Sequence, residues 1–253
     1  MARAADILVK TLTEHGVDRA FCVPGESYLA VIDAMYDAPE IDVVTTRHEG
    51  GAGFMAVADA KMTGKPGIVM VSRGPGATNA SIGVHVAQQD AVPMVMFVGQ
   101  VAREDIGRNA FQEVDYSQTF GDMAKWIVEI TEADKIAENV RRAFTIAQSG
   151  IPGPVIVSLP EDMLLDQTDA PALGPTKIIQ PKPDAGDIVE LCDMLSAAER
   201  PVIIAGGQIG GERGREALRA VSESWNVPVA VSWRHQDLFD VDHPNYACHL
   251  AFN

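Results

Sequence analysis

Over the first 165 residues, short runs of consecutive apolar residues alternate with longer stretches in which apolar positions recur every three or four residues. The short runs are typical of strands buried in a parallel sheet, and the longer period is typical of helices packed on such a sheet. Strands are predicted at 19–23, 41–46, 67–72, 93–98 and 154–159. Helices are predicted at 7–15, 28–36, 50–62, 77–89 and 133–149, with further helical turns within 116–129. This alternation predicts an α/β fold with a doubly wound parallel sheet and helices on both faces.

The pattern changes after residue 165. Residues 166–186 hold four prolines and few large apolar side chains, which is typical of an extended linker. Beyond it the sequence predicts helices at 188–198 and 213–225 and strands at 201–205 and 227–231. No further strand is predicted over 237–253. Two strands do not complete a doubly wound sheet. The predicted organisation is therefore a domain at 1–165, a linker at 166–186 and an incomplete domain at 187–253.

Composition and charge narrow the function classes. The 253 residues carry 20 Lys and Arg against 35 Asp and Glu, a formal charge of −15. Such a charge repels phosphates, which argues against nucleic acid and anionic membranes as partners. The three cysteines are too few for a disulfide framework, and neither a signal peptide nor an apolar stretch of about 20 residues is present. These features predict a cytoplasmic protein that is not bound to a membrane.

Four segments, three of them rich in glycine, follow the predicted strands at the edge of the sheet where ligands bind in such folds. They are residues 24–27, 47–52, 73–79 and 99–100. Each segment alone is compatible with ordinary turn chemistry, and Glu49 is equally compatible with a carboxylate that complements a helix dipole. Because all four segments come to one edge, a binding site around Glu49 is the stronger interpretation. Motifs for a serine nucleophile, a phosphate-binding lysine or a His-x-x-x-His metal site do not occur.

Six motifs occur in order along this part of the chain: FCVPG at 21–25, RHEGGA at 47–52, SRGPGATN at 72–79, AFQE at 110–113, PGPV at 152–155 and LPED at 159–162. Together they resemble the N-terminal, pyrimidine-binding domain of thiamine diphosphate enzymes of the acetolactate synthase group. Residues 187–253 resemble the first part of the central, Rossmann-like domain of that family. The resemblance implies the thiamine diphosphate-binding fold for residues 1–165.

The resemblance also assigns site residues. Glu49 matches the glutamate that hydrogen-bonds N1′ of the aminopyrimidine ring of the cofactor. A carboxyl group in a poorly hydrated pocket favours its protonated form, and it then pushes the ring toward the imino tautomer that removes the thiazolium C2 proton. Four further residues match the lining of the pyrimidine pocket and two match positions near the substrate: Pro24, Gly25, Pro75 and Asn79, and Phe111 and Gln112.

For the complete enzyme, the resemblance implies decarboxylation of a small 2-keto acid and transfer of the resulting acyl or aldehyde unit. It also implies a homodimer or homotetramer whose subunits share active sites. In the family a third domain holds Mg²⁺ and the diphosphate through a Gly-Asp-Gly…Asn motif, which the 253 residues lack. The chain is therefore expected to supply no metal ligand and to be inactive alone.

Departures from the family pattern concern mainly charge. Ile151 stands where flavin-containing synthases usually carry an arginine, and Glu161 stands where they tend to carry a lysine. Glu26 and Ser27 replace small apolar residues. These changes argue against a bound FAD. They leave open a 2-keto acid decarboxylase, or an enzyme similar to sulfoacetaldehyde acetyltransferase or glyoxylate carboligase.

Two hypotheses belong to other classes. Residues 206–211 hold four glycines between a predicted strand and a predicted helix, which is a weak pattern for a nucleotide-binding module because the Gly-x-Gly-x-x-Gly order is missing. The second hypothesis is a non-catalytic, oligomerising domain. Glu49 argues against it, because a carboxylate buried without a purpose costs stability.

Overall fold

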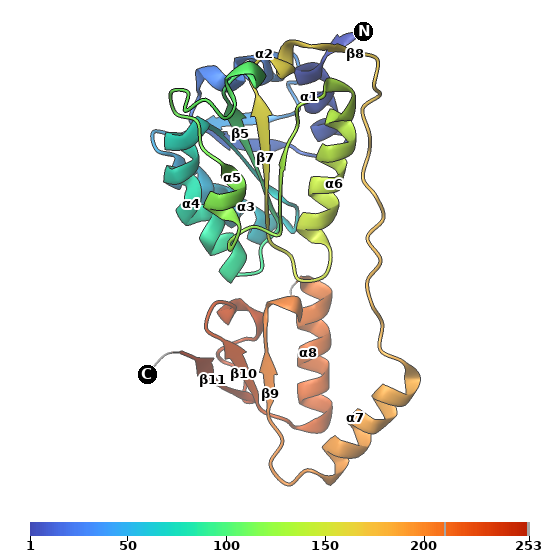
Figure 1. Cartoon of the computed structure of the whole chain (residues 1–253). Helices are drawn as coiled ribbons and strands as arrows, with labels where there is room; N and C mark the ends of the chain where they lie inside the picture. Colours follow the sequence, from blue (N-terminus) through green and yellow to red (C-terminus); the bar gives the residue numbers. More distant parts are fainter. Residues whose placement is uncertain (210, 252–253) are drawn as a thin grey trace. The chain divides into compact units, whose positions relative to one another are not determined.

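The computed structural model describes residues 1–209 and 211–251, and the chain divides into two compact units, Met1–Ile179 (unit 1) and Gln180–Asn253 (unit 2). Unit 1 is built on a six-stranded sheet with helices on both faces, and unit 2 contains a three-stranded sheet (Figure 1). No helix among the described residues is long and apolar enough to cross a membrane. The α/β fold class with a parallel sheet, predicted from the sequence, is confirmed.

All six strands of the unit 1 sheet are parallel, in the order β3-β2-β4-β5-β7-β6. Their bounds are Arg19–Cys22 (β2), Asp42–Thr45 (β3), Gly67–Ser72 (β4), Met94–Gln100 (β5), Trp126–Glu129 (β6) and Pro154–Pro160 (β7). Strands β5 and β7 are buried along their whole length, as expected for apolar runs covered on both faces. After β3 the chain passes β2 and begins β4 on the other side. The carboxyl ends of β2 and β4 therefore form the switch point of the sheet, where such folds bind ligands.

Helices cover both faces of this sheet (Figure 1). One face carries α1 (Ala4–Glu14), α2 (Leu29–Tyr36) and α6 (Ile136–Gln148). The other face carries α3 (Glu49–Thr63), α4 (Arg73–Gln89) and α5 (Tyr116–Phe120). Successive residues of a strand point to opposite faces. Val95 of β5 accordingly packs in the first core and Met96 in the second.

Helices α3 and α4 pack closely because each has a glycine at their crossing. A Cβ atom on Gly83 would lie 2.6 Å from Cα of Gly53, and a Cβ atom on Gly53 would lie 3.1 Å from Cα of Gly83. A larger residue at position 83 would push the helices apart. Both helices begin at the carboxyl edge of the sheet, so this crossing also fixes the separation of their first turns.

Helical turns are predicted within 116–129, with no strand there, and the absence of a strand is wrong for the end of this range. The structure has the short helix α5 and then strand β6. Strand β6 lies at the edge of the sheet and pairs with β7. The guanidinium of Arg142 lies over the ring of Trp126 in this strand, 4.6 Å from the ring centroid. Trp-Ile-Val is a favourable composition for a strand, but four residues are too few for periodicity to reveal it.

The chain leaves unit 1 after one further strand pair. Gln167–Thr168 (β8) pairs antiparallel with Ala2–Arg3 (β1), directly before α1. The backbone N–H of Ala4 also donates to the carbonyl of Asp166 at 2.9 Å. Residues 169–184 then contain neither helix nor strand, and the boundary between the two units falls within them.

Unit 2 has three parallel strands in the order β11-β10-β9, with bounds Ile203–Ala205 (β9), Val229–Ser232 (β10) and Tyr246–Leu250 (β11). Its helices are α7 (Ala185–Ala197) and α8 (Glu212–Trp225). The prediction of no strand over 237–253 is wrong, because β11 adds to β10. Four of the five residues of β11 are exposed, so apolar alternation gives no indication of the strand.

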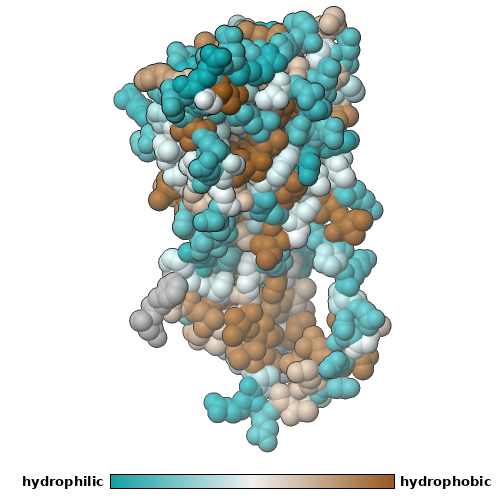
Figure 2. Space-filling model, viewed as in Figure 1, coloured by the Kyte–Doolittle hydropathy of each residue, from teal (hydrophilic) through white to brown (hydrophobic). Residues whose placement is uncertain are grey.

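The sheet of unit 2 is incompletely covered. Ala205, Leu218 and Val231 belong to a small core, whereas Ile204 of β9 is exposed. Helix α7 has no buried residue, and Figure 2 shows apolar side chains gathered at the surface over the strands of this unit. Parallel sheets are normally covered on both faces. Unit 2 is therefore the less completely packed of the two units.

Candidate active site

The loop after β2 rests on the end of β4 at the switch point. A Cβ atom on Gly25 would lie 2.4 Å from Cβ of Ser72, so only glycine permits this approach. The hydroxyl oxygens of Ser27 and Ser72 lie 2.8 Å apart. The phenol of Tyr28 donates to the carbonyl of Val23 at 2.5 Å. These contacts hold the loop in one position beside the start of α4.

Glu49 is the first residue of α3, at the carboxyl end of β3. His48 caps this helix, since its Nδ1 accepts a hydrogen bond from the backbone N–H of Gly50 at 3.0 Å. The Glu49 carboxylate lies at the positive end of the helix dipole, which stabilises negative charge. Nδ2 of Asn79, in the second turn of α4, donates to Oε2 of Glu49 at 2.9 Å. This hydrogen bond joins the starts of α3 and α4.

The second oxygen of Glu49 remains available for a ligand. A Cβ atom on Gly76 would lie 3.6 Å from Oε1, so α4 presents backbone without a side chain at this point. Glu49 is partly buried. Within residues 1–209 and 211–251, its carboxylate has neither a further hydrogen bond nor an ion pair. The centre of the site is therefore an oriented carboxylate without a counter-ion.

The first turn of α4 also contacts the segment that follows β5. The backbone N–H of Gly74 donates to the carbonyl of Gln112 at 3.0 Å. A Cβ atom on Gly74 would lie 2.5 Å from Cγ2 of Val114. Both Arg73 and Gln112 have positive φ angles, 40° and 68°, which strain non-glycine residues and often mark functional sites. One turn of helix thus links Gln112 on one side to Glu49 on the other.

The residues predicted for the pyrimidine pocket lie around the start of α4, on the loop after β2 and in the first turns of α3 and α4. Glu49 and Asn79 are hydrogen-bonded to each other, and Gly25 packs on β4. Pro24 and Pro75 are exposed, on the loop after β2 and in the first turn of α4. Their assignment to a cofactor pocket stays a prediction.

The two residues predicted near the substrate lie on the other side of this turn. Gln112 is joined to it through the Gly74 hydrogen bond, whereas the Phe111 side chain is 78% exposed. Among the described residues no hydrogen bond links either side chain to Glu49. Their proximity to a substrate stays a prediction as well.

Sequence patterns do not single out Arg73, which the structure places at the centre of a charge cluster. Its side chain is only 10% exposed, with Nη2 2.6 Å from Oε2 of Glu161 and Nη1 3.4 Å from Oε1 of Glu26. Glu26 and Glu161, which both depart from the family pattern, are thus counter-ions of the same arginine. Their relation was hidden because the three residues follow three different strands, β2, β4 and β7.

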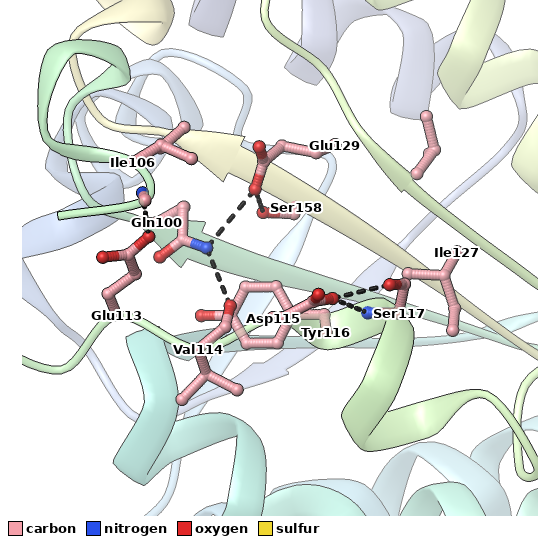
Figure 3. Close-up of a pocket in the computed structure, with 12 residues that line it drawn as sticks. Gln100, Ile106, Glu113, Val114, Asp115, Tyr116, Ser117, Ile127, Glu129 and Ser158 are labelled. Atoms are coloured by element: carbon pink, nitrogen blue, oxygen red, sulfur yellow. Dashed lines mark hydrogen bonds between the residues drawn. The ribbon is translucent and has the colours of Figure 1, made fainter. Parts of the chain in front are cut away.

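A separate cavity of about 410 Å³ lies at the carboxyl ends of β5, β6 and β7 (Figure 3). Nε2 of the buried Gln100 donates to the carbonyl of Val114 at 3.1 Å and to Oε2 of Glu129 at 3.3 Å, and the Ser158 hydroxyl donates to the same Glu129 oxygen at 3.1 Å. Burial, and after it the Glu129 charge, raises the pKa of Tyr116 above its usual range. The lining contains carboxylates and no lysine or arginine. The carboxylates of the lining oppose a negatively charged ligand there, whereas the Arg73 charge acts on Tyr116 in the opposite direction.

The glycine-rich segment 206–211 follows β9, and Gly210 lies outside the described residues. Residues Gly207–Ile209 form a short 3-10 turn. A Cβ atom on Gly207 would lie 2.2 Å from Nε2 of His235, so a side chain there would have to displace the His235 ring. Ligand binding by this loop stays a prediction.

Comparison with known protein families matches two successive parts of the chain. Residues 2–119 match the model described as "Thiamine pyrophosphate enzyme, N-terminal TPP binding domain". Residues 188–252 match the model described as "Thiamine pyrophosphate enzyme, central domain". Together the two matches cover more than half of the 253 residues, and the first contains all the predicted site residues.

Relatives at 34–38% identity carry one activity in their names. The mitochondrial acetolactate synthase catalytic subunit of Aspergillus candidus is 37% identical over 250 residues, which cover 93% of this chain and 36% of the relative. The acetolactate synthase isozyme 3 large subunit of Escherichia coli (strain K12) is 34% identical over 249 residues, covering 96% and 43%. The acetolactate synthase large subunit of Lactococcus lactis subsp. lactis (strain IL1403) is 38% identical over 229 residues, covering 89% and 40%. The chain thus spans 36–43% of the length of these relatives, and it belongs to the thiamine pyrophosphate enzyme family.

Proposed function

We propose that this chain is the cofactor-activating part of an enzyme that decarboxylates a small 2-keto acid and transfers the resulting acyl or aldehyde unit. The observation that carries the proposal is the Glu49 carboxylate, oriented by Asn79 at the switch point with one oxygen available. Acetolactate synthase-like carboligation is the preferred reaction, because the relatives named above are acetolactate synthases. The enzyme would accordingly be a transferase or lyase.

The residues at the switch point fit the aminopyrimidine end of thiamine diphosphate. Oε1 of Glu49 has no hydrogen-bond partner among the described residues and lies beside the backbone of Gly76, where a Cβ atom would be 3.6 Å away. When bound, the cofactor would supply an acidic carbon at C2 of its thiazolium ring and a place for the electron pair released by decarboxylation of a keto acid. Glu49 would hold this cofactor by a hydrogen bond from its carboxyl group to N1′ of the ring.

Proton transfer at one atom is the contribution of this chain to the reaction. With the cofactor bound, Oε1 of Glu49 would be placed to exchange a proton with the ring nitrogen, as a general acid–base group must be able to do at hydrogen-bonding distance. The carboxylate left behind is stabilised by the positive end of α3 and by the Asn79 amide. The crossing at Gly53 and Gly83 keeps both stabilising groups in place while the proton moves.

A second copy of the chain would complete the site, giving a homodimer or homotetramer with shared active sites. Phe54 and Met55 of α3 and Ile82 of α4 are 48%, 45% and 51% exposed. Ile82 is one turn beyond Asn79 and Phe54 one turn beyond Gly50, so this apolar surface adjoins the Glu49 carboxylate. Large apolar side chains gathered beside a site support association through that surface.

Mg²⁺ and the diphosphate would be held by residues outside this chain. The carboxylate at the centre of the site and the net charge of −15 both oppose binding of a diphosphate by these residues alone. The 253-residue chain should therefore bind the cofactor weakly and show no turnover. A C-terminal domain that supplies the metal site is part of the proposal.

The charge departures bear on the finer assignment. Ile151 is exposed and Glu161 is paired with Arg73, so neither position offers positive charge to a flavin, which supports an enzyme without FAD. A 2-keto acid decarboxylase or a sulfoacetaldehyde acetyltransferase-like enzyme is the alternative within this class. The cytoplasm is the proposed location, since Cys22, Cys192 and Cys248 are all free thiols.

Turnover of a panel of 2-keto acids tests the proposal. The protein expressed from its complete reading frame, with Mg²⁺ and thiamine diphosphate, should release carbon dioxide and form a carboligation product from at least one of them. Glu49→Gln should lower that rate by at least about 100-fold, the usual scale of general acid–base catalysis. Glu212→Gln is the matched control, because Glu212 is likewise the first residue of a helix, α8. Equal rates in Glu49→Gln and the control would overturn the proposal.

A further inference from the structure

Arg73 connects the carboxyl ends of three strands in unit 1. It follows β4 directly, and its guanidinium is paired with Glu161 beyond β7 at 2.6 Å and with Glu26 beyond β2 at 3.4 Å. Arginine is rarely buried unless it is paired. The cluster therefore ties together segments that follow three different strands, in addition to the Ser27–Ser72 hydrogen bond between two of them.

Two features of Arg73 oppose stability. Its φ angle of 40° is strained for any residue with a Cβ atom. Its Nε atom is buried and has no hydrogen-bond partner among the described residues. A buried polar group without a partner is destabilising, and a buried ion pair is by itself weak evidence for stabilisation. Fold stability alone does not account for an arginine in this place.

The residues that follow Arg73 contact both ends of the candidate site. Gly74 donates a hydrogen bond to the carbonyl of Gln112 at 3.0 Å, and a Cβ atom on Gly76 would lie 3.6 Å from Oε1 of Glu49. Gln112 itself has a φ angle of 68°. The position of this single turn therefore sets the position of the Gln112 backbone relative to the Glu49 carboxylate.

We propose that Arg73 is a positioning residue, which fixes the first turn of α4 and through it the segment 107–114, joined to that turn by the Gly74–Gln112 hydrogen bond. This inference rests on the proposed function only for its consequence in catalysis. Arg73 acts by holding Glu161 and Glu26, and it does not touch the ligand. Glu161 is a counter-ion within this arrangement and does not serve as a substrate contact.

Amide hydrogen exchange on the 253-residue chain tests the positioning directly and needs no activity. Arg73→Met keeps an apolar stem and removes the charge, and it should speed exchange over 107–114 about 10-fold, the change expected when a buried ion pair no longer restrains local opening. Glu161→Gln should act in the same direction. The double variant should be no faster than Arg73→Met, because both substitutions break one interaction.

Arg19→Met is the matched control, since Arg19 also pairs with two carboxylates, Asp59 at 3.0 Å and Asp42 at 3.5 Å, but at the amino end of β2. It should leave exchange over 107–114 unchanged. If Arg73→Met does not fold, Glu161→Gln gives the same test with the arginine retained. The inference would be overturned if either Arg73→Met or Glu161→Gln exchanged over 107–114 as slowly as Arg19→Met.

A kinetic measurement on the complete enzyme separates positioning from a merely structural role. Arg73→Met should raise KM for the 2-keto acid about 10-fold with a change in kcat below about 3-fold, because it displaces a substrate-proximal segment and leaves Glu49 intact. Arg73→Lys keeps the positive charge, so its KM should lie close to that of the unmodified enzyme. A fall in kcat with unchanged KM would overturn positioning of this segment. Failure of the Glu49 experiment would instead remove the proposed function and leave the exchange result standing.

Discussion

The crossing of α3 and α4 predicts that one added methyl group damages both stability and the site. In Gly83→Ala, the new Cβ atom would lie 2.6 Å from Cα and 2.8 Å from the carbonyl carbon of Gly53, about 1 Å inside ordinary van der Waals contact. Backbone atoms of a helix cannot rotate away, so the two helices must separate. Asn79 lies one turn before Gly83, so its hydrogen bond to Glu49 must weaken at the same time.

Two effects of opposite sign determine the magnitude. Alanine is favoured over glycine inside a helix by about 1 kcal/mol. Overpacking costs about 1–3 kcal/mol, and a clash between two backbones belongs at the upper end of that range. The expected net loss is about 2 kcal/mol in the free energy of unfolding, which lowers the melting temperature of a chain of this size by roughly 4–8 °C.

Thermal unfolding of the 253-residue chain, followed by circular dichroism, checks this value. Gly51→Ala is the control, because Gly51 lies in α3 and a Cβ atom there has no heavy atom within 4 Å. It should raise the melting temperature by roughly 2–4 °C through helix propensity alone. A melting temperature for Gly83→Ala equal to or above that of the unmodified chain would refute the close crossing.

Three further predictions concern other parts of unit 1. Asn79→Ala removes the amide that orients Glu49 and should slow turnover by the complete enzyme roughly 10- to 100-fold, with little change in melting temperature; an unchanged rate would contradict the role of Asn79. Burial, and after it the charge of Arg141, lowers the pKa of His15 from 6.5, so the unfolded chain binds a proton that the folded chain does not. The neutral His15 therefore costs no stability above pH 6.5, and the free energy of unfolding falls as the pH drops from 6.5 toward the lowered pKa. His15→Phe should therefore reduce the drop in melting temperature between about pH 7.5 and 5.5, and an equal drop would exclude His15 as its source. Ile82→Glu should turn the proposed dimer into a monomer in sedimentation velocity, and a persisting dimer would place the interface elsewhere.

The fold was predictable where apolar runs are long and buried on both faces. Strands β4, β5 and β7 satisfy this condition, and their positions follow from the sequence within a residue or two. The two missed strands, β6 and β11, lie at sheet edges and are paired on one side only. The apolar run of β6 is only three residues long, and four of the five residues of β11 are exposed, so neither strand has the pattern of a long buried strand.

The candidate site was predictable where its chemistry depends on a single position. Glu49 stands out because a carboxylate between a strand and a small-residue helix falls at the ligand-binding edge of the sheet. The partnership of Arg73 with Glu26 and Glu161 could not be predicted, since sequence spacing carries no information about side chains from three separate strand ends. A departure from a family pattern at one position is therefore best interpreted together with its spatial neighbours.

Exchange of the C2 proton of thiamine diphosphate with solvent deuterium tests the central claim most directly, because loss of this proton depends on the proton transfer assigned to Glu49 and needs no substrate. The measurement uses the protein expressed from its complete reading frame with Mg²⁺, followed by rapid acid quench and proton NMR. Glu49→Gln should slow the exchange by at least about 100-fold, while Glu212→Gln at the start of α8 should exchange like the unmodified enzyme. Exchange in Glu49→Gln at the rate of the Glu212→Gln control would contradict the account.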